Sequence, residues 1–261
     1  MKSLALVADG LGQAKLESLA LPFGFFGSTA TNRDRAKRAP AELAQQCTEL
    51  WTSRHRDGET GVASTGGMRQ LAFLVTGALE VATTYMKATL YPGDVLFVDD
   101  PAATAATLSY RGDCRIVHVA VSDAWQAAGT VAPVLDSDGR AAHDAALIRN
   151  MFVKDGQAHF RDFAALFPAS GETPRRPVAK GSFTALSPGA FGDWHTEEPT
   201  NLVIVLGGQF ELEVGGDGGA VEVFRAGDVC LVEDHEGQGH ITRTRGETRF
   251  AAFAIPDDQL W

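Results

Sequence analysis

Residues 202–212, Leu-Val-Ile-Val-Leu-Gly-Gly-Gln-Phe-Glu-Leu, decide the fold of this chain because a version of them occurs earlier. Residues 71–81, Leu-Ala-Phe-Leu-Val-Thr-Gly-Ala-Leu-Glu-Val, share the apolar pattern, the glycine and the glutamate at an offset of 202 − 71 = 131. Two more pairs of blocks follow in order at an offset of 227 − 93 = 134, namely 93–95 with 227–229 and 111–115 with 245–249. Three matching blocks in one order predict an internal duplication.

The repeated blocks are typical of β-strands, because they are short, rich in Val, Leu, Ile and Phe, and separated by Gly and Pro. Pro92-Gly93-Asp94 and 226–228 predict turns that precede buried strands, and 215–219 predicts a hairpin tip. A helical pattern is limited to 41–51 and 141–151, and 127–176 reads as a linker with local structure. The predicted fold is therefore all-β with a few short helices.

Composition excludes several classes of protein. Of 261 residues, 44% are hydrophobic and 21% charged, which is typical of a soluble globular chain. The formal charge of -10 is unfavourable for binding nucleic acid or an anionic membrane, and no apolar run is long enough to span a bilayer. Cys47, Cys114 and Cys230 form no Cys-x-x-Cys pair, so we expect reduced, buried thiols. The start lacks a signal-peptide core, and a cytoplasmic location is expected.

Four blocks of the C-terminal half resemble a cupin domain: 192–197 (Gly-Asp-Trp-His-Thr-Glu), 205–211, 226–229 and Gly239-His240. The duplication makes the chain most similar to two-domain cupins, or bicupins, of the RmlC-like superfamily, among them uncharacterised bacterial cupin-domain proteins. The resemblance implies two tandem β-barrels of jelly-roll type. They would comprise an N-terminal barrel over 1–126 and a linker with a C-terminal barrel over 127–261. It also implies a homodimer.

Many cupins are metal enzymes whose first motif offers His-x-His and a Glu and whose second motif offers one His. Mapped onto this chain, His195 falls on the first His, Glu197 on the second, Asn201 near the Glu, and His240 on the His of the second motif. Two imidazoles and a carboxylate can hold one divalent Fe, Mn, Ni or Zn ion. The alternative is a metal-free pocket in which both histidines hydrogen-bond a ligand. His235, in the polar loop 233–237, either lines the barrel mouth, where it would bind the ligand, or is solvated.

The two halves differ in these positions. Ser64, Gly66, Gln70 and Ala106 stand opposite the four C-terminal residues, so the N-terminal barrel keeps no metal ligand. The sequence thus places function in the second barrel, which we expect to bind a small oxygenated or carboxylated molecule without metal. The alternative is a metal-dependent enzyme of dioxygenase, isomerase or decarboxylase type. In that enzyme His195, Glu197 and His240 would be the metal ligands or the catalytic acid and base, and Asn201 would bind and orient the substrate.

Overall fold

The structure is a computed structural model that describes residues 1–26, 46–63, 67–99, 106–125, 129–131, 145–216, 218–259 and 261. Within these residues the chain forms β-strands and two 3₁₀-helices, η2 (Ala164–Leu166) and η3 (Asp257–Gln259). The prediction of an all-β fold with few helices is confirmed. In the described part of the chain, no helix is both long and apolar enough to cross a membrane.

The chain divides into two compact units. Unit 1 comprises Met1–Pro22, Gln46–Ala146 and Phe167–Arg176, and unit 2 comprises Phe23–Gln45, Leu147–Leu166 and Pro177–Trp261. The predicted division after residue 126 differs from these units. Strand pairing places a segment before residue 126 in unit 2 and segments after it in unit 1. β3 (Gly24–Phe26) pairs with β15 (Lys180–Leu186) of unit 2, and β13 (Gly171–Glu172) pairs with β4 (Cys47–His55) of unit 1.

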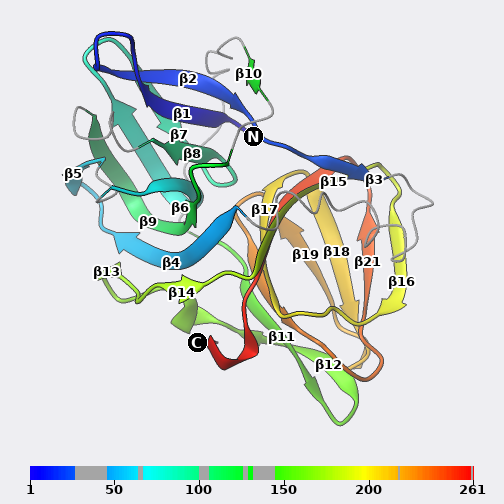
Figure 1. Ribbon diagram of the computed structural model, residues 1–261. Coiled ribbons are helices and arrows are strands. Elements are labelled where there is room, and N and C mark those ends of the chain that lie inside the picture. The colour runs from blue at the N-terminus through cyan, green and yellow to red at the C-terminus, as the bar shows by residue number, and fades with distance from the viewer. Residues whose placement is uncertain are drawn as a thin grey trace. The chain divides into compact units, whose positions relative to one another are not determined.

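Unit 1 is built on one sheet whose strand order is β10-β2-β1-β8-β6-β9-β4-β13 (Figure 1). Its two longest strands, β6 and β9, pair along most of their length with register shifts between Leu74 and Ala78. The hairpin of β1 and β2 joins the sheet through β1, which lies parallel to β8. The further strands are β1 (Ser3–Ala8), β2 (Ala14–Ala20), β5 (Thr60–Val62), β6 (Arg69–Ala82), β7 (Lys87–Leu90), β8 (Val95–Val98), β9 (Thr107–Val121) and β10 (Gly129–Val131), and β14 (Arg176–Pro177) begins in this unit.

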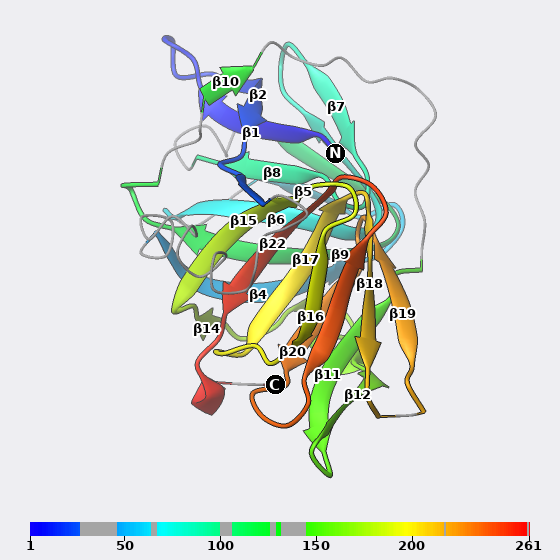
Figure 2. The same ribbon diagram turned by 90° about the vertical axis from the view of Figure 1, so that its right-hand side faces the viewer.

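Unit 2 contains two sheets, with strand orders β12-β11-β20-β17-β22-β15-β3 and β16-β21-β18-β19 (Figures 1 and 2). The hairpin of β11 and β12 joins the first sheet through β11, which lies parallel to β20. The strands are β11 (Ile148–Lys154), β12 (Gln157–Asp162), β16 (Phe191–His195), β17 (Asn201–Gly207), β18 (Gln209–Val214), β19 (Val221–Arg225), β20 (Val229–Glu233), β21 (His240–Thr244) and β22 (Thr248–Ala254).

The pairing patterns of the two units repeat each other. β4, β6, β8 and β9 are connected as β15, β17, β20 and β22 are, and each unit adds a hairpin whose first strand is parallel to the β8 or β20 position. The long β6 corresponds to β17 followed by β18, and β9 to β21 followed by β22. The duplication read from the sequence is thus a duplication of topology, and it extends to hairpins that the sequence comparison did not match.

The aspartates of the two predicted turns make the same contacts in each unit. Asp228 accepts backbone N–H groups of Leu147, at 2.8 Å, and Arg225, at 2.6 Å. Asp94 accepts those of Lys2 and Tyr91. Each carboxylate therefore connects its turn to the start of a hairpin, which is β1 and β2 in unit 1 and β11 and β12 in unit 2. Strands β8 and β20 follow directly and are buried, as the turns predict.

Both predicted helices are wrong where the structure describes them. Cys47 to Trp51 belongs to β4, and Ile148 to Met151 belongs to β11, while 41–45 and 141–144 lie outside the described residues. The apolar residues of 41–51 match a helical period, but pairing with β9 and β20 gives these segments backbone hydrogen bonds that override it. The predicted hairpin of β18 and β19 is confirmed.

Candidate functional site

A cavity of about 360 Å³ lies inside unit 2. It is lined by side chains of β15, β16, β17, β18, β20, β21 and β22 and by the loop between β16 and β17, so strands of both sheets enclose it. The lining residues are Lys180, Ser182, Thr184, Leu186, His195, Thr196, Glu197, Glu198, Pro199, Asn201, Val203, Phe210, Leu212, Val232, His240, Thr242, Phe250 and Ala252.

Strand alternation explains which side chains enter the cavity. Every second residue of β15 from Lys180 to Leu186 lines it, as do Phe210 and Leu212 of β18 and His240 and Thr242 of β21. The intervening residues of β15 are buried on the other face. The alternation of side chains along these strands therefore lines the cavity with residues that carry hydroxyl, imidazole or ammonium groups and with apolar rings.

Unit 1 fills the corresponding space with aromatic rings. Trp51 pairs in register with His118, just as Ser182 pairs with Ala252. The rings of Trp51 and His118 stack with centroids 5.1 Å apart and an interplanar angle of 8°, and both side chains are buried. Small side chains at the same two positions leave the interior of unit 2 open. Ser182 and Ala252 are thus a physical reason for the cavity.

His195 and His240 come together on the neighbouring strands β16 and β21, with ring centroids 4.3 Å apart. Nδ1 of His240 lies 2.6 Å from Oδ2 of Asp234, a carboxylate that is fully buried. Nδ1 of His195 lies 2.6 Å from the backbone oxygen of Asp193. The pair of imidazoles that the sequence predicts is therefore present, and each ring is held by an oxygen atom on its Nδ1 side.

The predicted carboxylate and amide also line the cavity. Nδ2 of Asn201 donates to the backbone oxygen of Pro199 at 2.7 Å and to Oε1 of Glu197 at 3.4 Å. Among the described residues, which include all four predicted positions, no group of three His, Cys, Asp or Glu side chains is arranged to hold a metal ion. A divalent metal needs a third ligand beside the two imidazoles, so the metal that the cupin resemblance implies stays a prediction.

His235 does not line the cavity. Its Nε2 lies 2.7 Å from Oγ1 of Thr200, a buried side chain that also donates to Oδ1 of Asp257 at 3.0 Å. The loop that carries His235 is thus connected to the C-terminal helix η3. In this arrangement the hydrogen bond of His235 joins two protein segments, and its ligand-binding role stays a prediction.

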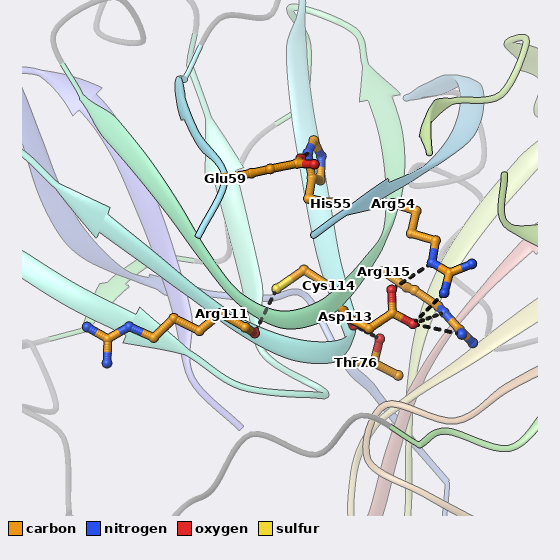
Figure 3. Close-up of polar contacts among 8 residues, drawn as sticks. All are labelled: Arg54, His55, Glu59, Thr76, Arg111, Asp113, Cys114 and Arg115. Carbon is orange, nitrogen blue, oxygen red and sulfur yellow. Dashed lines mark hydrogen bonds and ion pairs between the residues drawn. The ribbon is translucent and has the colours of Figure 1, made fainter. Parts of the chain in front are cut away.

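In unit 1, position 106 is the buried Ala106, Gln70 is largely buried, and Ser64 and Gly66 lie outside the described residues. Polar groups occur elsewhere in this unit, as a chain around Ser53. Its Oγ lies 2.8 Å from Nε2 of His118 and 3.2 Å from Nε2 of His55. Nδ1 of His55 is in turn 3.3 Å from Oε2 of Glu59, and these two side chains are drawn in Figure 3. Ser53 is fully buried, so this hydroxyl is not placed to attack a substrate.

A second polar group in Figure 3 is an ion cluster. Asp113 accepts hydrogen bonds from Arg54, at 2.6 Å, and from Arg115, at 2.8 Å. Desolvation raises the pKa of Asp113, but the hydrogen bonds and charges of Arg54 and Arg115 together outweigh it, so the pKa lies below its usual value. All three side chains are partly exposed, so the cluster is a surface feature of low energetic weight.

The three cysteines are buried and none forms a disulfide, as the sequence predicts. Burial raises the pKa of the Cys47 thiol to about 12 and also raises that of Cys230. A neutral buried thiol is a poor nucleophile, so these side chains belong to the core.

Sequence reasoning missed Asp234 and the polar residues of β15. Asp234 lies in the same loop as His235, but only the backbone path shows which of the two reaches His240. Lys180, Ser182 and Thr184 carry a readable signal, since they alternate with residues that pack in the core. They precede the cupin-like motif at 192–197, and no pattern in the sequence indicates which face of β15 lines a cavity.

Comparisons with known proteins identify similar folds at low identity. No protein-family model and no curated protein sequence matches the chain. Among solved structures, it is similar to a cupin 2 conserved barrel domain protein from Leptotrichia buccalis, with 12% identity, a TM-score of 0.40, and coverage of 80% of this chain and 84% of that one. It is also similar to a protein of unknown function of the DUF861 family from Pseudomonas syringae, with 14% identity, a TM-score of 0.38, and coverage of 78% and 82%. A variant of oxalate decarboxylase from Bacillus subtilis matches with 12% identity, a TM-score of 0.31, and coverage of 88% and 73%.

Proposed function

We propose that unit 2 is a binding module whose cavity holds a small oxygenated or carboxylated molecule without a metal ion. The observation that carries this proposal is the cavity itself, about 360 Å³ in volume and lined by both polar and apolar side chains. Cavities that bind small molecules have volumes of roughly 300 to 1,000 Å³, with a few polar groups set among apolar ones.

The polar groups favour an oxygenated ligand. Ser182, Thr184 and Thr242 offer hydroxyl groups that both donate and accept hydrogen bonds, and His240 adds an imidazole. Lys180 is an exposed residue of the same lining, and its ammonium would pair with a carboxylate. Phe210, Leu212 and Phe250 supply apolar surface for the carbon skeleton of the ligand.

A thermal-shift screen of small sugars, polyols and carboxylic acids, carried out in excess chelator, tests the proposal. We expect some of these compounds to raise the melting temperature. The double substitution Ser182→Trp with Ala252→His copies the filled interior of unit 1, and it should abolish that stabilisation while the protein stays folded. Stabilisation that is equal in the double variant, or that requires added metal ions, would overturn the proposal.

A pair of lysine variants tests the carboxylate part of the proposal. Lys180→Met removes the cavity ammonium, and we expect it to weaken carboxylic acids more than neutral sugars. Lys154→Met is the matched control, because Lys154 is an exposed lysine of β11 in the same unit that does not line the cavity. Equal effects of the two substitutions on carboxylic acids would contradict a role for Lys180.

The predicted homodimer stays a proposal. Light scattering should give a mass close to twice the 27.7 kDa of one chain. A mass of one chain over the working concentration range would show that the protein is a monomer.

A further inference from the structure

We propose that the cavity of unit 2 takes an amphipathic ligand, with its polar head at the mouth of the cavity and its apolar tail at the far end. The mouth is the end that Lys180 and Asn201 line, and the far end is the one that Leu186, Phe210 and Phe250 line. The inference rests on the proposed function and deepens it, because it names the class of molecule that the same cavity holds.

The side chains of β15 that line the cavity become less exposed along the strand. Lys180 is exposed, and Ser182 and Thr184 are half-buried. Leu186, the last of this series, is only 1% exposed. At about 3.3 Å for each residue, the strand rises about 20 Å from the first to the last of these side chains. The gradient of exposure places the mouth of the cavity at Lys180 and its closed end at Leu186.

The loop that follows Leu186 borders the far end. Oγ1 of Thr244 donates to the backbone oxygen of Ser187 at 2.9 Å and accepts the backbone N–H of Ala190 at 2.9 Å, so it holds this loop at both ends. The buried Ala190 packs with Leu186 and Phe250. The far end is therefore bounded by packed apolar side chains and a hydrogen-bonded loop.

The register of the first sheet places polar and apolar side chains at different depths. Ala254 of β22 pairs with both Lys180 and Asn201, so these two polar residues share one level of the sheet. Phe250 lies about 13 Å away along β22 and pairs with Thr184. The mouth thus carries an ammonium and an amide, whereas the deeper level carries an aromatic ring and one hydroxyl group.

The second sheet has the same order. His240 and Thr244 are the two ends of β21. His240 pairs with His195, whereas Thr244 pairs with Phe210. The rings of Phe210 and Phe250 have centroids 5.9 Å apart, so the aromatic levels of the two sheets meet. The far end is therefore lined by aromatic rings from both sheets, and the imidazoles lie at the other end of their strands.

The loop between β16 and β17 adds polar groups to the mouth. It runs from His195 to Asn201, which joins the histidine end of β16 to the level of Lys180. Glu197 and Glu198 line the cavity from this loop. The mouth thus offers an amide and groups of both charges, which favour a polar head over an apolar one.

Burial and desolvation set the orientation of such a ligand. Each methylene that moves from water into an apolar site tightens binding about fourfold. A carboxylate at the far end would lose its hydration, and of the described lining residues only Lys180, at the mouth, carries a permanent positive charge. The tail therefore gains most at the far end, and the head loses least at the mouth.

Calorimetry with straight-chain carboxylic acids from acetate to octanoate, in excess chelator, tests the inference. We expect the dissociation constant to fall about fourfold for each added methylene until the cavity is filled. The filled double variant, Ser182→Trp with Ala252→His, should lose this dependence on chain length.

A matched pair of phenylalanine variants locates the tail. Phe250 and Phe160 are both partly buried against the same core cluster, but only Phe250 lines the cavity. Phe250→Ala should weaken octanoate at least about tenfold and acetate by less than about twofold, whereas Phe160→Ala should leave the ratio of the two unchanged. Thr184→Phe keeps the ring of Phe250 and fills the space beside it, so it should also weaken octanoate at least about tenfold, as the loss of two buried methylenes would.

Acetate that binds as tightly as octanoate would overturn the inference and leave the proposed binding function standing. Octanoate that binds the filled double variant equally well would place the tail outside the cavity and would also overturn it. So would equal effects of Phe250→Ala and Phe160→Ala on octanoate together with no effect of Thr184→Phe. The proposed function itself fails only if no compound of the thermal-shift screen binds through the cavity.

Discussion

Lowering the pH should destabilise unit 1 through His118. This imidazole is buried against Trp51, and desolvation, with smaller effects of the charges of His55 and Arg175, lowers its pKa from 6.5 to about 3. The folded chain therefore keeps His118 neutral at pH values where the unfolded chain protonates it. Its stability contribution is fully present above pH 6.5 and is lost as the pH falls from 6.5 to 3.

The size of the effect follows from the two pKa values. Between them the free energy of unfolding falls by about 1.4 kcal/mol for each pH unit. Because the midpoint of protonation in the unfolded chain is near 6.5, the free energy of unfolding should be about 2 kcal/mol lower at pH 5 than at pH 8 from this group alone.

The test is equilibrium urea unfolding at pH 8 and pH 5, with hydrogen exchange of β9 peptides to identify the transition of unit 1. His118→Gln keeps a group that can bond Ser53 but does not titrate, so its loss of stability between the two pH values should be about 2 kcal/mol smaller than that of the unmodified chain. Val117→Ala is the control, since it destabilises the same buried strand and keeps the imidazole. Equal pH dependence in His118→Gln and the unmodified chain would refute the reasoning.

Three further substitutions test the fold by urea unfolding. Asp228→Ala should cost about 3 kcal/mol, because it removes a carboxylate that accepts two backbone N–H groups; a loss under 1 kcal/mol would show that water replaces it. Gly208→Ala should cost more than Gly218→Ala, because both residues have positive φ, at 71° and 75°, but only at Gly208 would the added Cβ meet the backbone of Glu247; equal costs would exclude the clash. Asp113→Asn should cost less than about 1 kcal/mol, since its arginine partners are partly exposed, and a larger loss would mean that the cluster is structurally important.

The sequence predicts the fold where local and long-range signals agree. The turns at 92–94 and 226–228 carry glycine and aspartate, and in both units the aspartate side chain accepts backbone N–H groups and a buried strand follows. The helices predicted at 41–51 and 141–151 fail because partner strands far along the chain decide the backbone of Cys47–His55 and Ile148–Lys154. The pairing of Gly24–Phe26 with a strand of unit 2 could not be predicted either, because a three-residue strand has no pattern that identifies its partner.

The candidate site shows the same limit. The motif positions of His195 and His240 lie together, since strands β16 and β21 pair through these residues. A metal site also requires a third ligand in the right orientation, and spacing alone does not give side-chain orientation. Asp234 became visible only from its distance to His240. The difference between an open and a filled interior depends on cross-strand pairs such as Ser182 with Ala252, which require the register.

The most direct measurement of the central claim is a crystal structure of the metal-depleted protein with the most stabilising compound from the screen. We predict density for that compound in the cavity of unit 2, with one of its oxygen atoms about 2.7 to 3.2 Å from a polar atom of the cavity lining, and no metal peak. A metal ion bound between His195 and His240, or density only outside the cavity, would contradict the account.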